Sequence, residues 1–331
     1  MVLICLNFPG WAGQLNTYLL FLDIPLCNFP TVKKYLPPLA VITAAFLWSL
    51  DGLLRQQLYS IPSFTIITLE HALGAILFLP FLIKNWTHVQ KLDQRGWGSV
   101  LWISVCGGIL GTFFYTKALS YVNFIDLSVV VLLQKFQPIF AIILAAVILK
   151  ERLTKRFLML AVTAFIGGYL VTFGNTPIAD WDDKTTIASL LALLAAFSWG
   201  SSTVLGKHAL NKLPFQVVTA LRLTITALLA GVILIGMQDM AEVVVLNTSQ
   251  WTALGTIVVS TGAVALFIYY YGLNLLPASH TTIYELFWPL SAICFDWFLR
   301  GRAMSPAQSA GAIILLTAIV LLTQERQNAD G

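Results

Sequence analysis

A few ionisable residues lie inside long apolar stretches, where they point to binding or chemistry. A charged side chain at the centre of a membrane span costs about 3 kcal/mol on insertion scales, so its presence there indicates a function. Those well inside the stretches are Asp51, Glu70, His71, Lys135, Arg222 and Glu285, and those nearer the ends are Asp126, His280 and Asp296.

Lys135 and Glu285 are the centre of the predicted substrate site. Gln134 matches Glu285 when the two halves of the chain are aligned, so Lys135 and Glu285 occupy nearly equivalent positions. One ammonium and one carboxylate near the midplane suit a zwitterion, while aromatic rings can bind its apolar or cationic side group. The predicted substrate-binding residues are Trp48, Asp51, Gln134, Lys135, Gln137, Trp199, Tyr284, Glu285 and Trp288.

Helical spacing places several of these residues on shared faces. Steps of three and four residues give one stripe on each of two predicted helices. The stripes are Ala44, Trp48, Asp51 and Arg55 on the first, and Thr281, Glu285, Trp288, Ala292 and Asp296 on the other. Pro138 directly follows Gln137, and a proline there frees a backbone carbonyl and can open the helix where it lines a cavity.

Ion pairing is the alternative role for the same charges. Lys135 with Asp51 or Glu70, and Glu285 with Arg222, could form buried pairs that only fix the packing. Both roles can hold in turn if a substrate exchanges places with one partner.

Glu70 and His71 form a second candidate site, for proton coupling. A carboxylate at membrane depth binds protons more readily than in water, and histidine titrates near neutral pH. Adjacent residues point about 100° apart on a helix, so at most one of the two faces a cavity squarely.

Metal, cofactor and ATP chemistry are not indicated. The four histidines and four cysteines show no metal-ligand spacing, and the cysteines show no disulfide framework. No glycine-rich Lys-Ser loop is present to bind ATP, and no paired His or Ser-His arrangement indicates an embedded enzyme. No cofactor and no nucleic acid are expected; the expected partners are a small-molecule substrate and the lipid bilayer, and a homodimer stays open.

The elements that must position these residues are membrane spans. The 331 residues are 58% hydrophobic and only 10% charged, against about a quarter in soluble domains, so the chain must face lipid. We predict an all-α polytopic membrane protein with ten transmembrane helices. The predicted spans are 36–58, 63–83, 97–119, 124–149, 155–174, 185–208, 214–236, 249–274, 278–299 and 305–323.

An internal repeat divides the spans into two halves of five. Ala44-Ala45-Phe46-Leu47-Trp48-Ser49 is echoed 151 residues later by Ala195-Ala196-Phe197-Ser198-Trp199-Gly200. Pro138 and Pro289 keep the same offset. Because five is odd, the halves must cross the membrane in opposite senses, as inverted repeats typical of transporters. A channel is possible, but unequal charges in inverted halves fit alternating access better.

The Trp48 and Trp199 helices, the segment Phe114-Tyr115-Thr116-Lys117-Ala118-Leu119, and Pro138 followed by Lys150-Glu151-Arg152-Leu153-Thr154 resemble the EamA family of the drug/metabolite transporter superfamily. The resemblance covers residues 36–323 and implies a ten-helix inner-membrane carrier that commonly exports amino acids or related metabolites. Two departures are Gly301-Arg302, where Gly-Glu is usual, and Glu70-His71, where Arg-Phe is usual; the usual Arg is present in the second half as Arg222.

Predicted organisation follows from these features. We expect an N-terminal extension over 1–35, repeats over 36–174 and 185–323, and a cytoplasmic tail over 324–331. Residues 1–32 have no positive region before Lys33, and a true start at Val32 is a simple explanation. Lys and Arg concentrate on the segments that are inner when both termini are cytoplasmic.

The sequence therefore predicts a secondary transporter in the inner membrane. Export of amino acids or related amine-bearing compounds by alternating access is favoured. The alternatives are exchange or uptake of a nucleotide-like cofactor such as S-adenosylmethionine and, as a different class, a membrane-embedded enzyme.

Overall fold

Long apolar segments of the chain form helices, several of which meet end to end. The computed structural model describes residues 30–58, 60–121, 133–174, 183–236, 246–301 and 303–329. The first half contains α1 (Pro30–Arg55), η2 (Gln56–Leu58), α2 (Ser63–Lys84), α3 (Trp86–Gln90), α4 (Gln94–Trp102), the π-helix η3 (Ile103–Leu110), α5 (Gly111–Tyr121), α7 (Gln137–Ile148) and α8 (Lys155–Phe173). The second half contains α9 (Asp183–Leu210), α10 (Phe215–Gly236), α12 (Thr248–Val259), α13 (Ala263–Leu275), α14 (Ala278–Tyr284), α15 (Phe287–Arg300) and α16 (Pro306–Ala329).

Polar caps set the ends of several helices. The side chain of Asp93 accepts a hydrogen bond from the first turn of α4, and Thr154 does the same for α8. Asn247 and Gln250 form a reciprocal capping box at the start of α12. Such caps satisfy amide groups that the helix itself leaves without partners. They therefore fix where the apolar helices begin.

Three predicted spans are interrupted near their middles. A turn at Lys135 and Phe136 precedes α7, with Pro138 in the first turn of that helix. Residues 260–262 separate α12 from α13, and Glu285 and Leu286 separate α14 from α15. The prediction that the helix opens beside Pro138 is confirmed. Irregular backbone at membrane depth is tolerated where it is buried in protein or lines a cavity, and it commonly forms binding sites.

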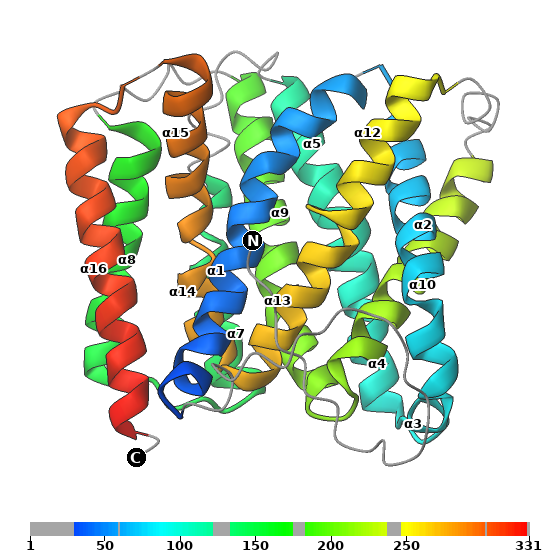
Figure 1. The fold of residues 1–331 in the computed structure, drawn as a ribbon, viewed down its shortest axis with the longest axis horizontal. Helices are drawn as coiled ribbons and strands as arrows, with labels where there is room; N and C mark the ends of the chain where they lie inside the picture. Colours follow the sequence, from blue (N-terminus) through cyan, green and yellow to red (C-terminus); the bar gives the residue numbers. More distant parts are fainter. Residues whose placement is uncertain are drawn as a thin grey trace.

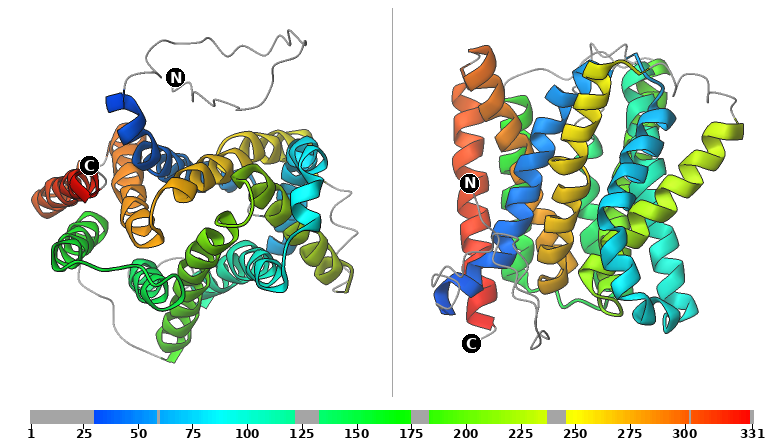
Figure 2. Two further views of the ribbon diagram at one scale, coloured as in Figure 1. Left: turned by 90° about the horizontal axis from the view of Figure 1, so that it is seen from below. Right: turned by 45° about the vertical axis from the view of Figure 1, so that its right-hand side comes forward.

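Helices of the two halves pack against one another in a symmetric pattern. α2 packs on α10 and α8 packs on α16, at opposite ends of the bundle (Figures 1 and 2). Between these ends, α1 packs on α13 and α15, while α9 packs on α5 and α7. Exchanging corresponding helices of the two halves reproduces the same set of contacts, which is the packing expected of a duplicated unit.

The two faces of the bundle can be followed in Figure 1. We call the lower face the side that holds the start of α1, the short helix α3 and the end of α16. The upper face holds the end of α1 and the start of α12. Along the sequence colours, α1 runs from the lower to the upper face, whereas α9 runs from the upper to the lower face.

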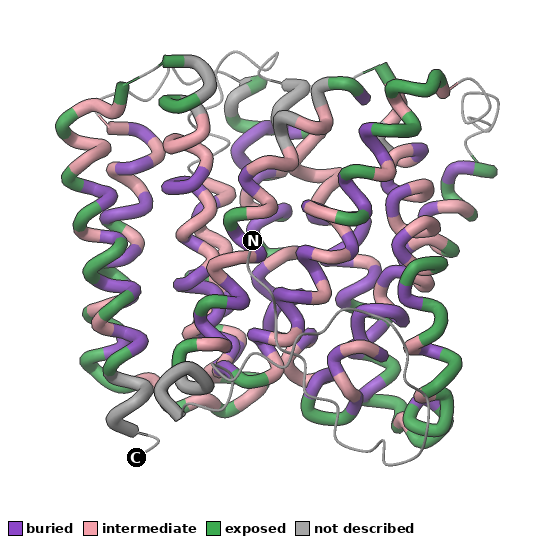
Figure 3. Tube along the Cα trace, in the orientation of Figure 1, coloured by how far each residue is buried: buried purple, intermediate pink, exposed green. Residues whose placement is uncertain are grey.

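The outer surface between the faces is apolar. Exposed positions recur along α16 and α2 in Figure 3, and many carry large hydrophobic side chains. Examples are Ile76, Ile83, Val162, Leu228, Val232 and Ile313. An exposed apolar belt of this kind is unfavourable in water and suited to lipid. The chain is therefore a multi-span membrane protein.

The described helices bear out the predicted spans in part. Seven helical segments are long and apolar enough to cross a membrane, and two shorter apolar helices cover Tyr35–Asp51 and Gln137–Ile148. The start of the predicted span 124–149, including Asp126, and most of the predicted 1–35 extension, including residues 1–29, lie outside the described residues.

Matching turns follow α7 and α15. Lys150 has φ +56° and Gly301, 151 residues later, has φ +65°. A left-handed conformation costs a non-glycine residue about 1 kcal/mol, so Lys150 is held there by its surroundings. Thr154 and Ser305, at the same offset, then cap α8 and α16. The repeat thus extends to backbone conformation that composition does not reveal.

Gly311→Ala is expected to destabilise the protein, because α8 and α16 approach closely at this residue. A Cβ atom at Gly311 would lie 2.7 Å from the backbone nitrogen of Val171, so the helices must separate. We expect a loss of about 1 to 3 kcal/mol in the free energy of unfolding. Gly255→Ala, on α12, is the matched control because its Cβ would meet nothing within 4 Å. Unfolding in detergent measures both, and equal midpoints would contradict the packing argument.

Candidate functional site

Glu285 lies in the break between α14 and α15 and is held by side chains from two other helices. Its Oε2 accepts a hydrogen bond from Nε2 of Gln137 at 2.7 Å, and its Oε1 accepts one from the hydroxyl of Tyr269 at 2.7 Å. Oγ1 of Thr203 on α9 lies 2.9 Å from the same hydroxyl. Glu285 therefore joins α7, α13 and the α14–α15 break at one point.

Lys135 and the aromatic rings lie around this carboxylate. The ammonium of buried Lys135 lies 3.9 Å from the centre of the Trp288 ring, a cation–π contact. Trp48 on α1 packs against Tyr269 with ring centres 5.1 Å apart. Nε2 of Gln134 donates to Oε1 of Gln137 at 3.2 Å. Six predicted residues, Trp48, Gln134, Lys135, Gln137, Glu285 and Trp288, thus belong to one polar and aromatic cluster, which we call the midplane cluster.

Tyr284 and Trp199, also predicted to bind substrate, make contacts in other directions. The hydroxyl of fully buried Tyr284 accepts a hydrogen bond from Thr323 on α16. Trp199 packs against Tyr115 with ring centres 5.6 Å apart and lies over Gly111 on α5. The structure therefore uses both rings in packing between helices.

Asp51, Arg55 and Glu70 form a separate ionic cluster, which we call the upper cluster. Arg55 donates from Nε to Asp51 and from Nη2 to Glu70, the latter at 2.8 Å. Oδ1 of Asp51 also accepts a hydrogen bond from Thr261 at 2.7 Å. Asp51, predicted to bind substrate, is thus placed in an ionic network that joins α1, α2 and the α12–α13 break.

The ion pairs anticipated from the sequence are not those of the structure. Among the described residues, the cation that pairs with Asp51 and Glu70 is Arg55, whereas Lys135 was expected. Arg222 donates to the hydroxyl of Tyr270 at 2.8 Å instead of pairing with Glu285. The reason is geometric, since Arg55 shares a helix face with Asp51 one turn away, at a spacing that favours pairing.

His71 hydrogen-bonds within its own helix, although it interacts electrostatically with Glu70 and Arg55 of the upper cluster. Its Nδ1 lies 2.8 Å from the backbone oxygen of Ile67, one turn earlier on the same helix. This carbonyl can only accept, so the Nδ1 carries a proton. The two predicted proton-coupling residues therefore have different surroundings: Glu70 contacts Arg55, and His71 contacts its own helix.

Glu151 positions the helix that ends at Glu285. Its carboxylate accepts hydrogen bonds from the backbone nitrogens of Ala278 at 2.7 Å and Ser279 at 3.1 Å, and from the Ser279 hydroxyl at 2.5 Å. These groups are at the start of α14, where a negative charge is stabilising. A residue of the first half thus holds in place the short helix that carries Glu285.

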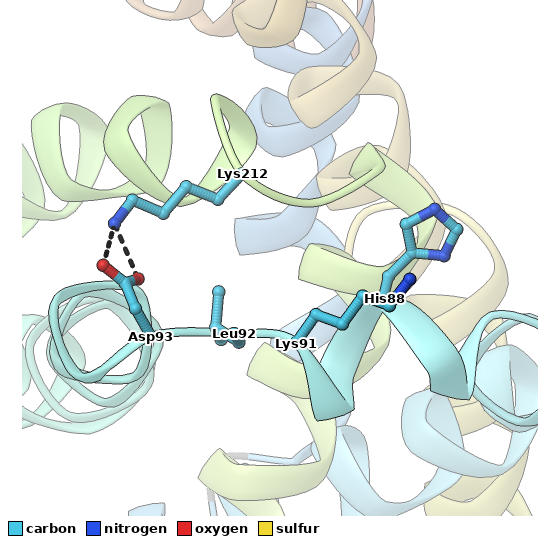
Figure 4. Close-up of a pocket in the computed structure, with 5 residues that line it drawn as sticks. All are labelled: His88, Lys91, Leu92, Asp93 and Lys212. Atoms are coloured by element: carbon cyan, nitrogen blue, oxygen red, sulfur yellow. Dashed lines mark hydrogen bonds and ion pairs between the residues drawn. The ribbon is translucent and has the colours of Figure 1, made fainter.

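A surface pocket of about 340 Å³ lies on the lower face, away from both clusters. Figure 4 shows its lining residues His88, Lys91, Leu92, Asp93 and Lys212. Nζ of Lys212 donates to both Asp93 oxygens, at 2.6 and 2.7 Å, and this contact holds the pKa of Asp93 below its usual range. The lining is mostly charged, and His88 supplies its one ring, so it offers a planar or apolar substrate little to bind.

Several residues of the two clusters were not predicted from the sequence. Tyr269 donates to Glu285, Thr203 hydrogen-bonds to the hydroxyl of Tyr269, and Thr261 donates to Asp51. The run Tyr269-Tyr270-Tyr271 in an apolar helix is the one sequence signal that could have indicated a polar face there. Within the described ranges, no group of three or more His, Cys, Asp or Glu side chains is arranged to hold a metal ion.

Arg55→Ala is expected to destabilise the protein because it leaves two carboxylates without their cation. The pair is partly accessible, so we expect a loss of about 2 kcal/mol, between the values typical of exposed and buried ion pairs. Lys212→Ala removes the exposed partner of Asp93 and serves as the control, with an expected loss below about 1 kcal/mol. Unfolding in detergent measures both. Equal losses would show that the upper cluster contributes no more than a surface pair.

Comparisons with known proteins identify the family. The profile of the EamA-like transporter family matches residues 36–173 and 186–324, once in each half. The riboflavin transporter ImpX of Fusobacterium nucleatum is 37% identical over 86% of this chain and 97% of its own. A riboflavin transporter of Brucella anthropi is 25% identical over 80% of this chain and 89% of its own.

A solved crystal structure agrees in fold. It is 18% identical and superposes with a TM-score of 0.70 over 89% of this chain and 98% of its own. The family predicted from the Trp48 and Trp199 helices is confirmed. The chain therefore belongs to the EamA-like transporter family, as a multi-span membrane protein that transports small metabolites.

Proposed function

We propose that this protein is a secondary transporter that carries riboflavin, or a closely related flavin, across the membrane. The observation that carries the proposal is the 37% identity to the riboflavin transporter ImpX over 97% of that protein's length. Relatives from Brucella anthropi and Vibrio cholerae, at 25% and 28% identity, have the same substrate in their names.

The midplane cluster offers groups that suit a flavin ring. Riboflavin has a planar ring system with an apolar end and an imide end, where one N–H lies between two carbonyl oxygens. Trp288 and Trp48 provide faces for the ring, as aromatic side chains do for nucleobases. Glu285 can accept from the imide N–H, while Gln137 and Lys135 can donate to the flanking carbonyls. Binding would exchange these side chains' present contacts for contacts with substrate.

An amino acid is the second candidate substrate. The observation that favours it is the presence of one ammonium, Lys135, and one carboxylate, Glu285, in the same cluster. In the structure these two groups are engaged with Trp288 and with Gln137 and Tyr269, which leaves less of their charge for a zwitterion. S-adenosylmethionine is the third candidate, since its adenine ring and positive charge suit the same aromatic and acidic groups.

Transport would proceed by alternating access between inverted halves of five spans each. The opposite directions of α1 and α9 and the exchange of helix contacts between halves support this arrangement. Lysines and arginines gather on the lower face, at Lys84, Lys91, Arg95, Lys150, Arg152, Lys155, Arg156 and Lys212. The positive-inside rule then assigns the lower face to the cytoplasm of an inner-membrane protein, with both ends of the chain inside.

Riboflavin counterflow is the first test. Purified protein in vesicles preloaded with unlabelled riboflavin is expected to draw in labelled riboflavin, and excess unlabelled amino acids should not compete. Glu285→Gln and Lys135→Ala should each slow exchange at least tenfold, because each removes a polar contact of about 1.4 kcal/mol or more. If riboflavin does not exchange but a labelled amino acid or S-adenosylmethionine does, that compound would replace riboflavin as the proposed substrate.

The variant Trp288→Leu tests whether riboflavin stacks on the Trp288 ring, independently of Lys135 and Glu285. Stacking on an aromatic side chain contributes about 1 to 3 kcal/mol for a nucleobase, so we expect the half-saturating riboflavin concentration to rise about tenfold or more. Trp297→Leu is the matched control on the same helix, since Trp297 lies on the outer surface at 45% exposure. If both variants behave alike, Trp288 does not contact the substrate.

A further inference from the structure

The upper cluster joins three parts of the bundle through one guanidinium. Arg55 bridges Asp51, on its own helix α1, to Glu70 on α2, and Thr261 ties Asp51 to the break between α12 and α13. Side-chain exposure falls from 34% at Arg55 through 24% at Asp51 to 11% at Glu70. The cluster therefore extends from the accessible end of α1 inwards to a buried carboxylate.

Charge is not balanced within this cluster. Two carboxylates share one guanidinium, which leaves one negative charge in excess when both are ionised and His71 beside them is neutral. Excess charge at membrane depth is unfavourable, and one proton on either carboxylate cancels it. The midplane cluster differs, because there the ammonium of Lys135 compensates the carboxylate of Glu285.

Titratable, charged and polar groups face the two carboxylates from α2, α10 and the α12–α13 break. On α2, His71 lies beside Glu70 in sequence and interacts electrostatically with Glu70 and Arg55, while its Nδ1 hydrogen-bonds to the oxygen of Ile67. A proton on His71 would also balance the cluster, so the His71→Gln variant below separates the two sites. On α10, Arg222 acts electrostatically on His71 and donates to Tyr270. From the α12–α13 break, Thr261 contributes a hydroxyl without charge.

The break between α12 and α13, which we take to be a hinge, lies directly against the same carboxylates. Thr261, which donates to Asp51, is the middle residue of the interruption at 260–262. A Cβ atom on Gly262 would lie 2.8 Å from Oε1 of Glu70, so the backbone of the break passes close over this oxygen. A change in charge at either carboxylate thus changes contacts at a point where the helix is already broken.

We propose that Asp51 and Glu70, bridged by Arg55, form a proton-binding site that couples substrate movement to the proton gradient. This inference rests on the proposed function and names its coupling ion. It differs from the sequence-based hypothesis, in which Glu70 acts with His71. One proton binds a carboxylate oxygen on one side of the membrane and leaves on the other as the hinge moves, and no bond in the substrate changes.

Gradient-driven uptake is the first measurement. Riboflavin is uncharged at neutral pH, so one proton per molecule predicts about tenfold accumulation per pH unit when the membrane potential is held at zero. Glu70→Gln and Asp51→Asn should each abolish this accumulation, so that riboflavin only equilibrates across the membrane, while counterflow continues in both variants. Asp93→Asn, a carboxylate on the lower face, should accumulate riboflavin like the wild type. Loss of the gradient response in His71→Gln, with Glu70→Gln unaffected, would overturn the assignment.

A second measurement does not depend on riboflavin. Infrared difference spectra of the protein in vesicles, between alkaline and acidic pH, should show the carbonyl band of a protonated carboxyl group. The band should lose intensity in Glu70→Gln and in Asp51→Asn and keep its intensity in Asp93→Asn. Its absence from the wild type, or its loss only in Glu285→Gln, would overturn the proton site. Failure of riboflavin counterflow with the band intact would overturn the flavin substrate and leave the proton site standing.

Discussion

Hydrocarbon provides no hydrogen-bond partners, so each polar group that this chain carries into the membrane must find its partner within the protein. Glu285 meets this constraint through Gln137 and Tyr269, and Arg55 meets it through Asp51 and Glu70. Because these partners lie on different helices, the contacts that make each charge tolerable also tie helices together. The binding chemistry and the packing of the bundle are therefore parts of one network.

Much of the fold and part of the site could be predicted from the sequence. The apolar spans, the repeat and the family follow from composition and from echoes such as Trp48 and Trp199, because these are properties of residue type and order. Gln137 and Glu285 were both expected at the site, since they are polar or charged residues in apolar segments near matching prolines, but the hydrogen bond between them was not. Polar and charged residues are rare in membrane spans, so they can be recognised in the sequence as candidate site residues.

The remaining contacts depend on helix rotation, which residue type does not encode. Tyr269 and Thr261 do not stand out in an apolar sequence, since burying a ring or a methyl group costs little free energy. Their importance comes only from the neighbour that each helix turns them toward. Arg55 shows the same effect, because the sequence placed it on one helix face with Asp51 but did not indicate that its side chain also reaches across to Glu70. Tyr284 shows the reverse, as it adjoins Glu285 in sequence but turns toward α16.

The contact between Glu151 and the start of α14 also bears on how the protein is made. A helix of seven residues is too short to be stable on its own, so α14 relies on its surroundings to form. Its cap comes from a residue synthesised more than a hundred positions earlier. The ribosome delivers the two in the required order, and the first half can serve as the template on which this part of the second half is completed during membrane insertion.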